Sequence, residues 1–300
     1  MKKQSPGKDA QIEALDISVR KEIQTTYQVR ADGKDIRIMD DVQSYATTHR
    51  SGLVTIGKRE SVGPVIDATN LSESTKVILK ATSASEGDFS SINGYDRMNL
   101  SFGYIQFAGG ASGQMLPRAL QKFKDQDAAG FQAALGRFGI DVTGKPPTLV
   151  CQDHNGTELR GEEAARFIGS DPQLAAVLAA SGTRMSMKTA QVEVSARILT
   201  DIRTHSVASA DVKVSDVITS EYGNGLLYDR CVNLGPGGTQ RALDDIVRMY
   251  LKDNPSVDLK NDPARAAIEA AFITWAEAQA PARAKHISAS TDHEPGSFVP

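Results

Sequence analysis

Cysteine and tryptophan are scarce in this chain, which has two cysteines and one tryptophan among its 300 residues. Two cysteines, Cys151 and Cys231, are too few for the disulfide framework that stabilises small secreted domains. The default expectation is that both are buried free thiols, and the sequence does not say whether they pair.

An excess of charge of one sign and long apolar runs are also lacking. The 34 Lys and Arg residues nearly balance the 37 Asp and Glu residues, so the net charge is -3. This balance provides no basic field for binding nucleic acid. No window approaches the roughly 18 consecutive apolar residues of a membrane span. With 40% hydrophobic and 24% charged residues, the composition is that of a soluble globular protein.

The N-terminus, Met1-Lys2-Lys3, carries positive charge, but no apolar run of signal-peptide length follows it. We therefore expect no Sec export. The chain is made in the cytoplasm, and action outside it requires another delivery route.

Residues 1–69 are predicted to form an N-terminal extension that packs on the main body. Within it, a short helix is favoured over extended chain for residues 10–28, although the apolar spacing is loose. A helix is also expected from Asp40 to Thr48, followed by a β-like run from Leu53 to Ile56.

The next predicted element is a helix over residues 71–86. Asn70 with Glu73 three positions on resembles an N-cap, and apolar residues then recur at helical spacing. Gly87 can end this helix, and the next residues, which are rich in Ser, Asn, Gly and Asp, cannot sustain it. The alternating aromatic run over residues 100–107 predicts a strand that completes a two-stranded hairpin.

From Met115 onward the chain is predicted to be mostly helical, so the expected fold class is mainly α with a small β part (α+β). Residues 70–287 form the predicted main domain, and residues 288–300 a flexible polar tail. Thr148 to Cys151 is a short candidate strand. The predicted helices cover residues 115–125, 127–138, 161–168, 171–180, 184–206, 214–234, 238–253 and 262–279.

Two carboxylates flank the predicted hairpin turn, Glu86 and Asp96. Acid-catalysed cleavage of a glycosidic bond needs one protonated carboxylic acid and one carboxylate that activates water or attacks carbon. Glu86 suits the acid role, because burial and a helix C-terminus both disfavour the anion. Asp96 suits the base role, because its neighbours are polar. The alternative for Asp96 is a turn residue that caps its own loop.

The glutamate at a helix end, the polar hairpin and the run from Ser101 to Phe107 together resemble the lysozyme-like superfamily. This superfamily includes goose-type lysozymes, soluble lytic transglycosylases and bacterial chitosanases. The bacterial chitosanases are the most similar, because their catalytic aspartate lies seven residues before a strand glycine, as Asp96 does before Gly103. A second resemblance is the stretch from Leu227 to Gly237, which is similar to that family's tyrosine-aspartate helix and following Gly-Pro-Gly.

The resemblance implies a two-lobed helical fold with a small β-hairpin beside an active-site cleft. In lytic transglycosylases a glutamine in a Gly-x-x-Gln segment lines the sugar cleft, and Gln106 matches it. Asp229 and Asn233 share a helix face, where they bound the cleft or brace the hairpin. Tyr228 shares this pair of alternatives, whereas the five candidates of the hairpin region have filling the core as their alternative. The residues expected to contact sugar are Tyr95, Asn99, Ser101, Tyr104, Gln106, Tyr228, Asp229 and Asn233.

The expected activity is hydrolysis of a β-1,4-linked amino-sugar polymer. Peptidoglycan is favoured over chitosan, because a chitosanase normally carries an export signal. Delivery by a secretion apparatus or by phage lysis suits an antibacterial wall-degrading effector, for which an immunity protein is a possible partner. The alternatives are a chitosanase, a lytic transglycosylase that uses Glu86 alone, and a non-catalytic glycan-binding protein.

No metal site or cofactor is expected. Cys151 and His154 lie at no recognisable zinc spacing, and the other histidines are scattered. The glycine-rich stretch from Gly235 to Gly238 lacks the Lys-Ser/Thr of a phosphate-binding loop, so a turn is the preferred interpretation.

Overall fold

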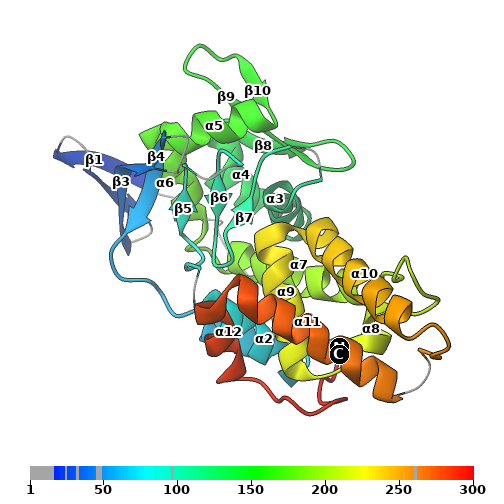
Figure 1. Cartoon of the computed structure of the whole chain (residues 1–300). Helices are drawn as coiled ribbons and strands as arrows, with labels where there is room; N and C mark the ends of the chain where they lie inside the picture. Colours follow the sequence, from blue (N-terminus) through cyan, green and yellow to red (C-terminus); the bar gives the residue numbers. More distant parts are fainter. Residues whose placement is uncertain are drawn as a thin grey trace, which may run out of the picture. The chain divides into compact units, whose positions relative to one another are not determined.

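The computed structural model describes residues 17–23, 26–31, 34–44, 49–84, 86–95, 98–111, 113–259 and 262–300. It is about 55% helix and 15% strand, which confirms a mainly α chain with a β component. The chain forms two compact units (Figure 1). Their boundaries differ from the division predicted after residues 69 and 287. The first unit comprises Met1–Gly57, Gly94–Leu100 and Gly109–Met187, and the second comprises Lys58–Asn93, Ser101–Ala108 and Lys188–Pro300.

The first unit begins with an antiparallel meander of four strands, in which each strand pairs with the next. Val19 lies opposite Val29, and Val29 lies opposite Ile36 in the following strand. The inward-facing side chains of Val29 and Ile38 are fully buried. The four strands are β1 (Ile17–Ile23), β2 (Thr26–Ala31), β3 (Lys34–Ser44) and β4 (His49–Ile56).

The meander overturns two predicted helices. Residues 17–23 and 26–28 are strand rather than helix, and so are residues 40–44 of the helix predicted over residues 40–48. Ladder hydrogen bonds from neighbouring strands outweigh a weak local helical pattern. The β-like run over residues 53–56 is confirmed within β4. The remaining parts of the two predicted helices lie outside the described residues.

Helix α6 (Pro172–Ser181) is the buried centre of the first unit. Every residue from Leu174 to Ser181 is buried, and the helix contacts all four strands of the meander. A helix that is apolar on all sides can be accommodated only inside a core. The side chain of Asp171 caps its N-terminus by accepting a hydrogen bond from the backbone N–H of Leu174 at 2.8 Å.

A second, three-stranded antiparallel sheet completes this unit. The strand predicted from Thr148 to Cys151 is confirmed as its central strand, and its two neighbours were not predicted. The sheet packs against helices α3 and α5. The elements are α3 (Met115–Gln126), α4 (Ala128–Ala134), η1 (Gly136–Phe138), β8 (Ile140–Thr143), β9 (Thr148–Gln152), β10 (Glu158–Arg160) and α5 (Glu162–Ser170).

Helix α9 (Glu221–Leu234) is the buried centre of the second unit, with every residue from Tyr222 to Cys231 buried. Gly225 lets a neighbouring helix approach closely, because a Cβ there would lie 2.5 Å from the side chain of Ile287. The helices around α9 are α2 (Glu73–Ser83), α10 (Pro236–Asp253), α11 (Asp262–Gln279) and α12 (Pro281–Ser288), of which α12 was not predicted.

The single helix predicted over residues 214–234 is in fact two, α8 (Val214–Val217) and α9. The buried carboxylate of Glu269 on α11 accepts hydrogen bonds from the backbone N–H groups of Thr219 and Ser220 at 3.0 and 2.8 Å. It also accepts from the Ser220 hydroxyl at 2.6 Å. Because these backbone groups bond to Glu269 instead of to the preceding helical turn, the helix breaks here and restarts at Glu221.

Three very short strands of the second unit form the predicted hairpin region: β5 (Ile92–Asn93), β6 (Ser101–Phe102) and β7 (Phe107–Ala108). The single strand predicted over residues 100–107 is wrong, because Phe102 pairs with Phe107 across a tight turn. Gly103 and Gln106 have φ angles of 83° and 54°, which a continuous strand does not contain.

The remaining predicted helices are confirmed, with shifts at their ends; the segment predicted over 127–138 divides into α4 and η1. The longest is α7 (Met185–Thr204), and a short helix α1 (Gly63–Asp67) was not predicted. Among the described residues, no helix is long and apolar enough to cross a membrane.

The segment after α12 packs on the second unit instead of forming the flexible tail predicted over residues 288–300. Phe298 is 8% exposed and lies under the Arg203 guanidinium, 4.2 Å from the ring centroid. Its backbone N–H donates to the Thr219 carbonyl at 3.2 Å. The buried ring of Phe298 and its backbone hydrogen bond therefore contribute to anchoring a segment whose composition is mostly polar.

Replacing Phe298 by alanine is expected to lower the free energy of unfolding by about 3 kcal/mol, the low end for truncating a buried phenylalanine. Val299→Ala is the matched control, because that neighbouring side chain is 61% exposed and its truncation is expected to cost less than about 0.5 kcal/mol. Urea denaturation followed by circular dichroism measures both. Equal stability of the two variants would contradict the packed tail.

Both cysteines are buried and free, as expected from the sequence. Burial raises the pKa of the Cys151 thiol to about 11 and that of the Cys231 thiol to about 12. Because the reactive species is the thiolate, neither is expected to react with a thiol-specific reagent in the folded protein at pH 8. We expect two thiols to be titrated in denaturant and none before unfolding; fast labelling of the native chain would contradict this.

Candidate functional site

Glu86 lies just beyond helix α2, not on its last turn as predicted. The helix ends at Ser83, and the backbone N–H of Glu86 donates to the Ser83 carbonyl at 3.1 Å. The Glu86 side chain is only 12% exposed. A carboxylate this far removed from water needs a charged or hydrogen-bonding partner.

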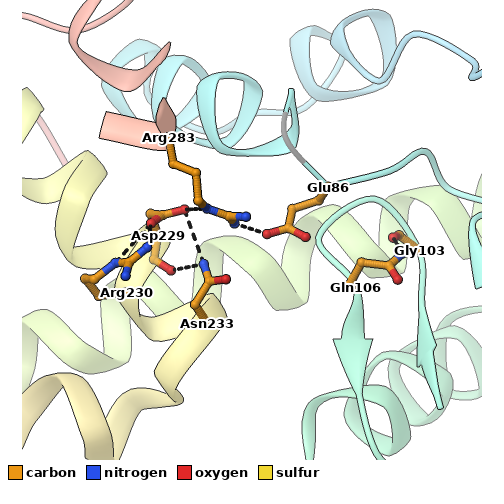
Figure 2. A network of polar contacts seen from close by, with 7 residues as sticks. All are labelled: Glu86, Gly103, Gln106, Asp229, Arg230, Asn233 and Arg283. Atoms are coloured by element: carbon orange, nitrogen blue, oxygen red, sulfur yellow. Dashed lines mark hydrogen bonds and ion pairs between the residues drawn. The ribbon is translucent and has the colours of Figure 1, made fainter. Parts of the chain in front are cut away.

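The partner is Arg283, near the start of helix α12. Its guanidinium binds Glu86 Oε1 through Nη2 and Asp229 Oδ1 through Nε, the latter at 2.8 Å. Figure 2 shows Arg283 reaching between the two carboxylates, which come from segments far apart in the chain. Arg283 is 22% exposed, so this ion network reaches the surface of the second unit.

Asp229 is held by a second guanidinium as well. Its Oδ2 accepts from Arg230 through Nε at 3.1 Å and through Nη2. The Asn233 amide, one turn further along α9, donates to Asp229 O at 2.7 Å and to Oδ1 at 3.3 Å. The shared helix face predicted for Asp229 and Asn233 is thus confirmed, and it serves an ion network.

Burial dominates the ionisation of this network. Removal from water raises the pKa of the Asp229 carboxyl, an effect that the hydrogen bond and positive charge of Arg230 partly offset. Burial also lowers the pKa of the Arg283 guanidinium. Both shifts reflect the cost of keeping charges out of water, so each group depends on its partners.

Gln106 lies beside the residue that follows Glu86. Its amide donates to the Gly103 carbonyl at 2.9 Å, and a Cβ on Gly87 would lie 3.2 Å from the Gln106 amide nitrogen. The φ angle of 54° is uncommon for a residue other than glycine and costs free energy. The turn between β6 and β7 therefore holds the Gln106 amide next to the Glu86 segment.

Three of the predicted sugar contacts are instead core residues of the second unit. Tyr104, Tyr228 and Ser101 are completely buried, so their side chains are not available to a ligand in this structure. The Tyr104 ring packs on Phe89 with centroids 5.1 Å apart, and burial raises the pKa of both tyrosines. The alternating aromatic pattern of the hairpin region therefore reflects packing in the core. Core filling is the alternative that the sequence left open for these residues.

The remaining predicted residues lie elsewhere or are not described. Tyr95 and Asn99 belong to the first unit, where Asn99 has a φ angle of 66°. Asp96, the predicted base, lies outside the described residues. Asn233 is exposed at the end of α9.

Sequence reasoning missed two residues of the network, Arg230 on α9 and Arg283 on α12. The chain contains a signal for α12, because Pro281 at the first helical position favours a helix start. No local pattern relates Arg283 to Glu86, which lies 197 positions earlier.

Two further features of the described residues bear on ligand binding. No group of three or more His, Cys, Asp and Glu side chains is placed to hold a metal ion. A pocket of about 350 Å³ lies between α2 and α12, and its lining includes Ala84 and His286 but none of the network side chains.

Comparisons with protein families, with curated proteins and with solved structures find no match to this chain.

Asp229→Asn is expected to destabilise the fold by about 3–5 kcal/mol, because it removes the buried negative charge that pairs with the buried Arg230 and the partly buried Arg283. Asp245→Asn is the matched control, since Asp245 forms an exposed pair with Arg248 and its loss is expected to cost under about 1 kcal/mol. Chemical denaturation midpoints compare the two variants. A wild-type midpoint for Asp229→Asn would show that the network contributes little.

Proposed function

We propose that this chain is a glycoside hydrolase in which Glu86 is the general acid. The observation that carries the proposal is the environment of Glu86: a mostly buried carboxylate bound to Arg283 and flanked by the Gln106 amide. Buried carboxylates with a dedicated charge partner are enriched at catalytic sites, although structural ion networks share this property.

Proton transfer requires Arg283 to change its contacts. A general acid carries its proton before donating it, and a guanidinium at hydrogen-bonding distance favours the anion instead. Arg283 is also bound to Asp229 through Nε. It can therefore release Glu86 and remain anchored, which leaves Glu86 free to protonate the glycosidic oxygen as substrate enters.

The second carboxylate of the proposal is Asp96, which would activate the attacking water. Inverting glycosidases hold their two carboxyl groups roughly 6.5–9.5 Å apart to leave space for that water, and retaining enzymes hold them about 5 Å apart. The proposal for Asp96 rests on its spacing from Gly103 in the sequence.

The proposed fold is the two-lobed lysozyme-like one, and the proposed substrate is a β-1,4-linked amino-sugar polymer. Support comes from the resemblance of the Glu86 and Tyr228-Asp229 segments to bacterial chitosanases, and from the network that joins them. The substrate we propose first is peptidoglycan, and the second candidate substrate is chitosan. We also propose that the protein acts as a wall-degrading effector, delivered by a secretion apparatus or by phage lysis, with an immunity protein as partner.

A lytic transglycosylase is the alternative reaction on the same site. Glu86 would then act alone, Asp96 would be dispensable, and the products would carry anhydro ends. Gln106 supports this alternative, because it matches the glutamine of the transglycosylase segment and its amide lies beside Gly87.

A second candidate function is glycan binding without cleavage. The pairing of Glu86 with Arg283 favours it, because a carboxylate neutralised in this way can serve structure alone. Such a protein would bind insoluble peptidoglycan and release no soluble fragments.

Glu86→Gln is expected to lower the release of soluble fragments by about 10²–10⁴-fold, the usual contribution of a general acid. Purified cell walls and chitosan are digested separately, and the products are identified by mass spectrometry. The matched control is Glu73→Gln on helix α2, whose side chain is 82% exposed, and it should retain wild-type activity.

The product spectrum also separates the alternatives. Undiminished release by Glu86→Gln would rule out the proposed acid, and binding by the wild-type chain without any release would favour the binding protein. Anhydro products together with an active Asp96→Asn variant would identify a lytic transglycosylase.

A further inference from the structure

Gln191 on helix α7 connects two segments that flank the proposed acid. Its side chain is completely buried. The amide Nε2 donates to the Phe89 carbonyl at 3.0 Å, and Oε1 accepts from the backbone N–H of Tyr104 at 3.2 Å. One side chain therefore ties the segment after Glu86 to the turn between β6 and β7.

The local backbone is shaped around this amide. A Cβ on Gly103 would collide with Gln191 Oε1, so glycine is required for space as well as for its φ angle of 83°. The N–H of Gly103 in turn donates to the Ser91 carbonyl at 2.8 Å. Because one partner of Gln191 is a donor and the other an acceptor, the site matches a carboxamide, which supplies both kinds of group.

Lys188, one turn earlier on α7, acts on the same segment. Its ammonium lies 2.8 Å from each carboxylate oxygen of Glu60 and 5.6 Å from the centroid of the Phe89 ring. The backbone N–H of Glu60 donates to the Asp88 carboxylate at 2.8 Å. The start of α7 thus holds the ring of Phe89 through Lys188 and its backbone through Gln191.

We propose that Gln191 is a positioning residue for the Glu86 acid, an inference that rests on the proposed function. Phe89 is three residues after Glu86, and Gln106 bonds to the Gly103 carbonyl one residue before Tyr104. By holding Phe89 and Tyr104 together, Gln191 sets the spacing between the Glu86 carboxylate and the Gln106 amide. It touches neither group itself.

The geometry of a reacting pair is sensitive to displacement, and an error near 1 Å can cost about 10²-fold in rate. Gln191→Met keeps the length of the side chain and removes both hydrogen bonds. We expect its kcat for glycan release to fall about 10- to 100-fold, with KM changing less than about twofold. A role in core stability alone would leave kcat of the folded fraction unchanged.

The matched control is Ile202→Val, which removes one buried methyl group from the same helix, three turns away from Gln191. It should retain wild-type kcat. Hydrogen–deuterium exchange is measured on the same proteins under native conditions. We expect Gln191→Met to raise exchange in residues 86–91 and 101–107 together, and Ile202→Val to leave both segments protected.

Two results would overturn the proposal: unchanged exchange in either segment of Gln191→Met, or faster exchange with an unchanged kcat. A different result would contradict the proposed function: a wild-type chain that releases no fragments from any glycan. In that case the exchange measurement alone tests whether Gln191 joins the two segments. Protection of both segments in Gln191→Met equal to that in the wild type would show that it does not.

Discussion

A buried carboxylate between two guanidinium groups is the interaction on which the second unit depends. Removing such charges from water costs several kcal/mol for each ion, and the cost is recovered only while the partners stay in place. Asp229 on α9 bonds to its neighbour Arg230 and to Arg283 on α12. The same contact that attaches α12 to α9 therefore directs Arg283 toward Glu86, so stability and the geometry of the site have one physical origin.

Close packing around α9 makes this network possible. Gly225 lets Ile287 of α12 approach the helix, and the Glu269 carboxylate fixes the residue at which α9 begins. On the other side of the site, Gln191 joins the segment after Glu86 to the turn that carries Gln106. Glu269 and Gln191 are thus side chains on long helices that satisfy backbone groups of segments distant in sequence.

Local sequence signals predicted those elements whose secondary structure is decided by their own residues. The helices from α3 to α11 follow apolar periodicity and Gly, Pro or Asp breaks, and the i, i+4 relation of Asp229 and Asn233 needs only helix geometry. The prediction was wrong where residues distant in sequence supply the hydrogen bonds that decide the secondary structure. The strands β1 to β3 depend on ladder pairing, and the break between α8 and α9 depends on Glu269.

The sequence by itself determined that the chain is mainly α, that its cysteines are buried and that Glu86 stands beside a polar hairpin. Tertiary structure alone decided that Glu86 meets Arg283 and that Tyr104 and Tyr228 are core residues. The physical reason is that burial and ion pairing are properties of distance in space. Periodicity reports only which face of an element a residue occupies, and a charge partner 197 positions away leaves no trace in it.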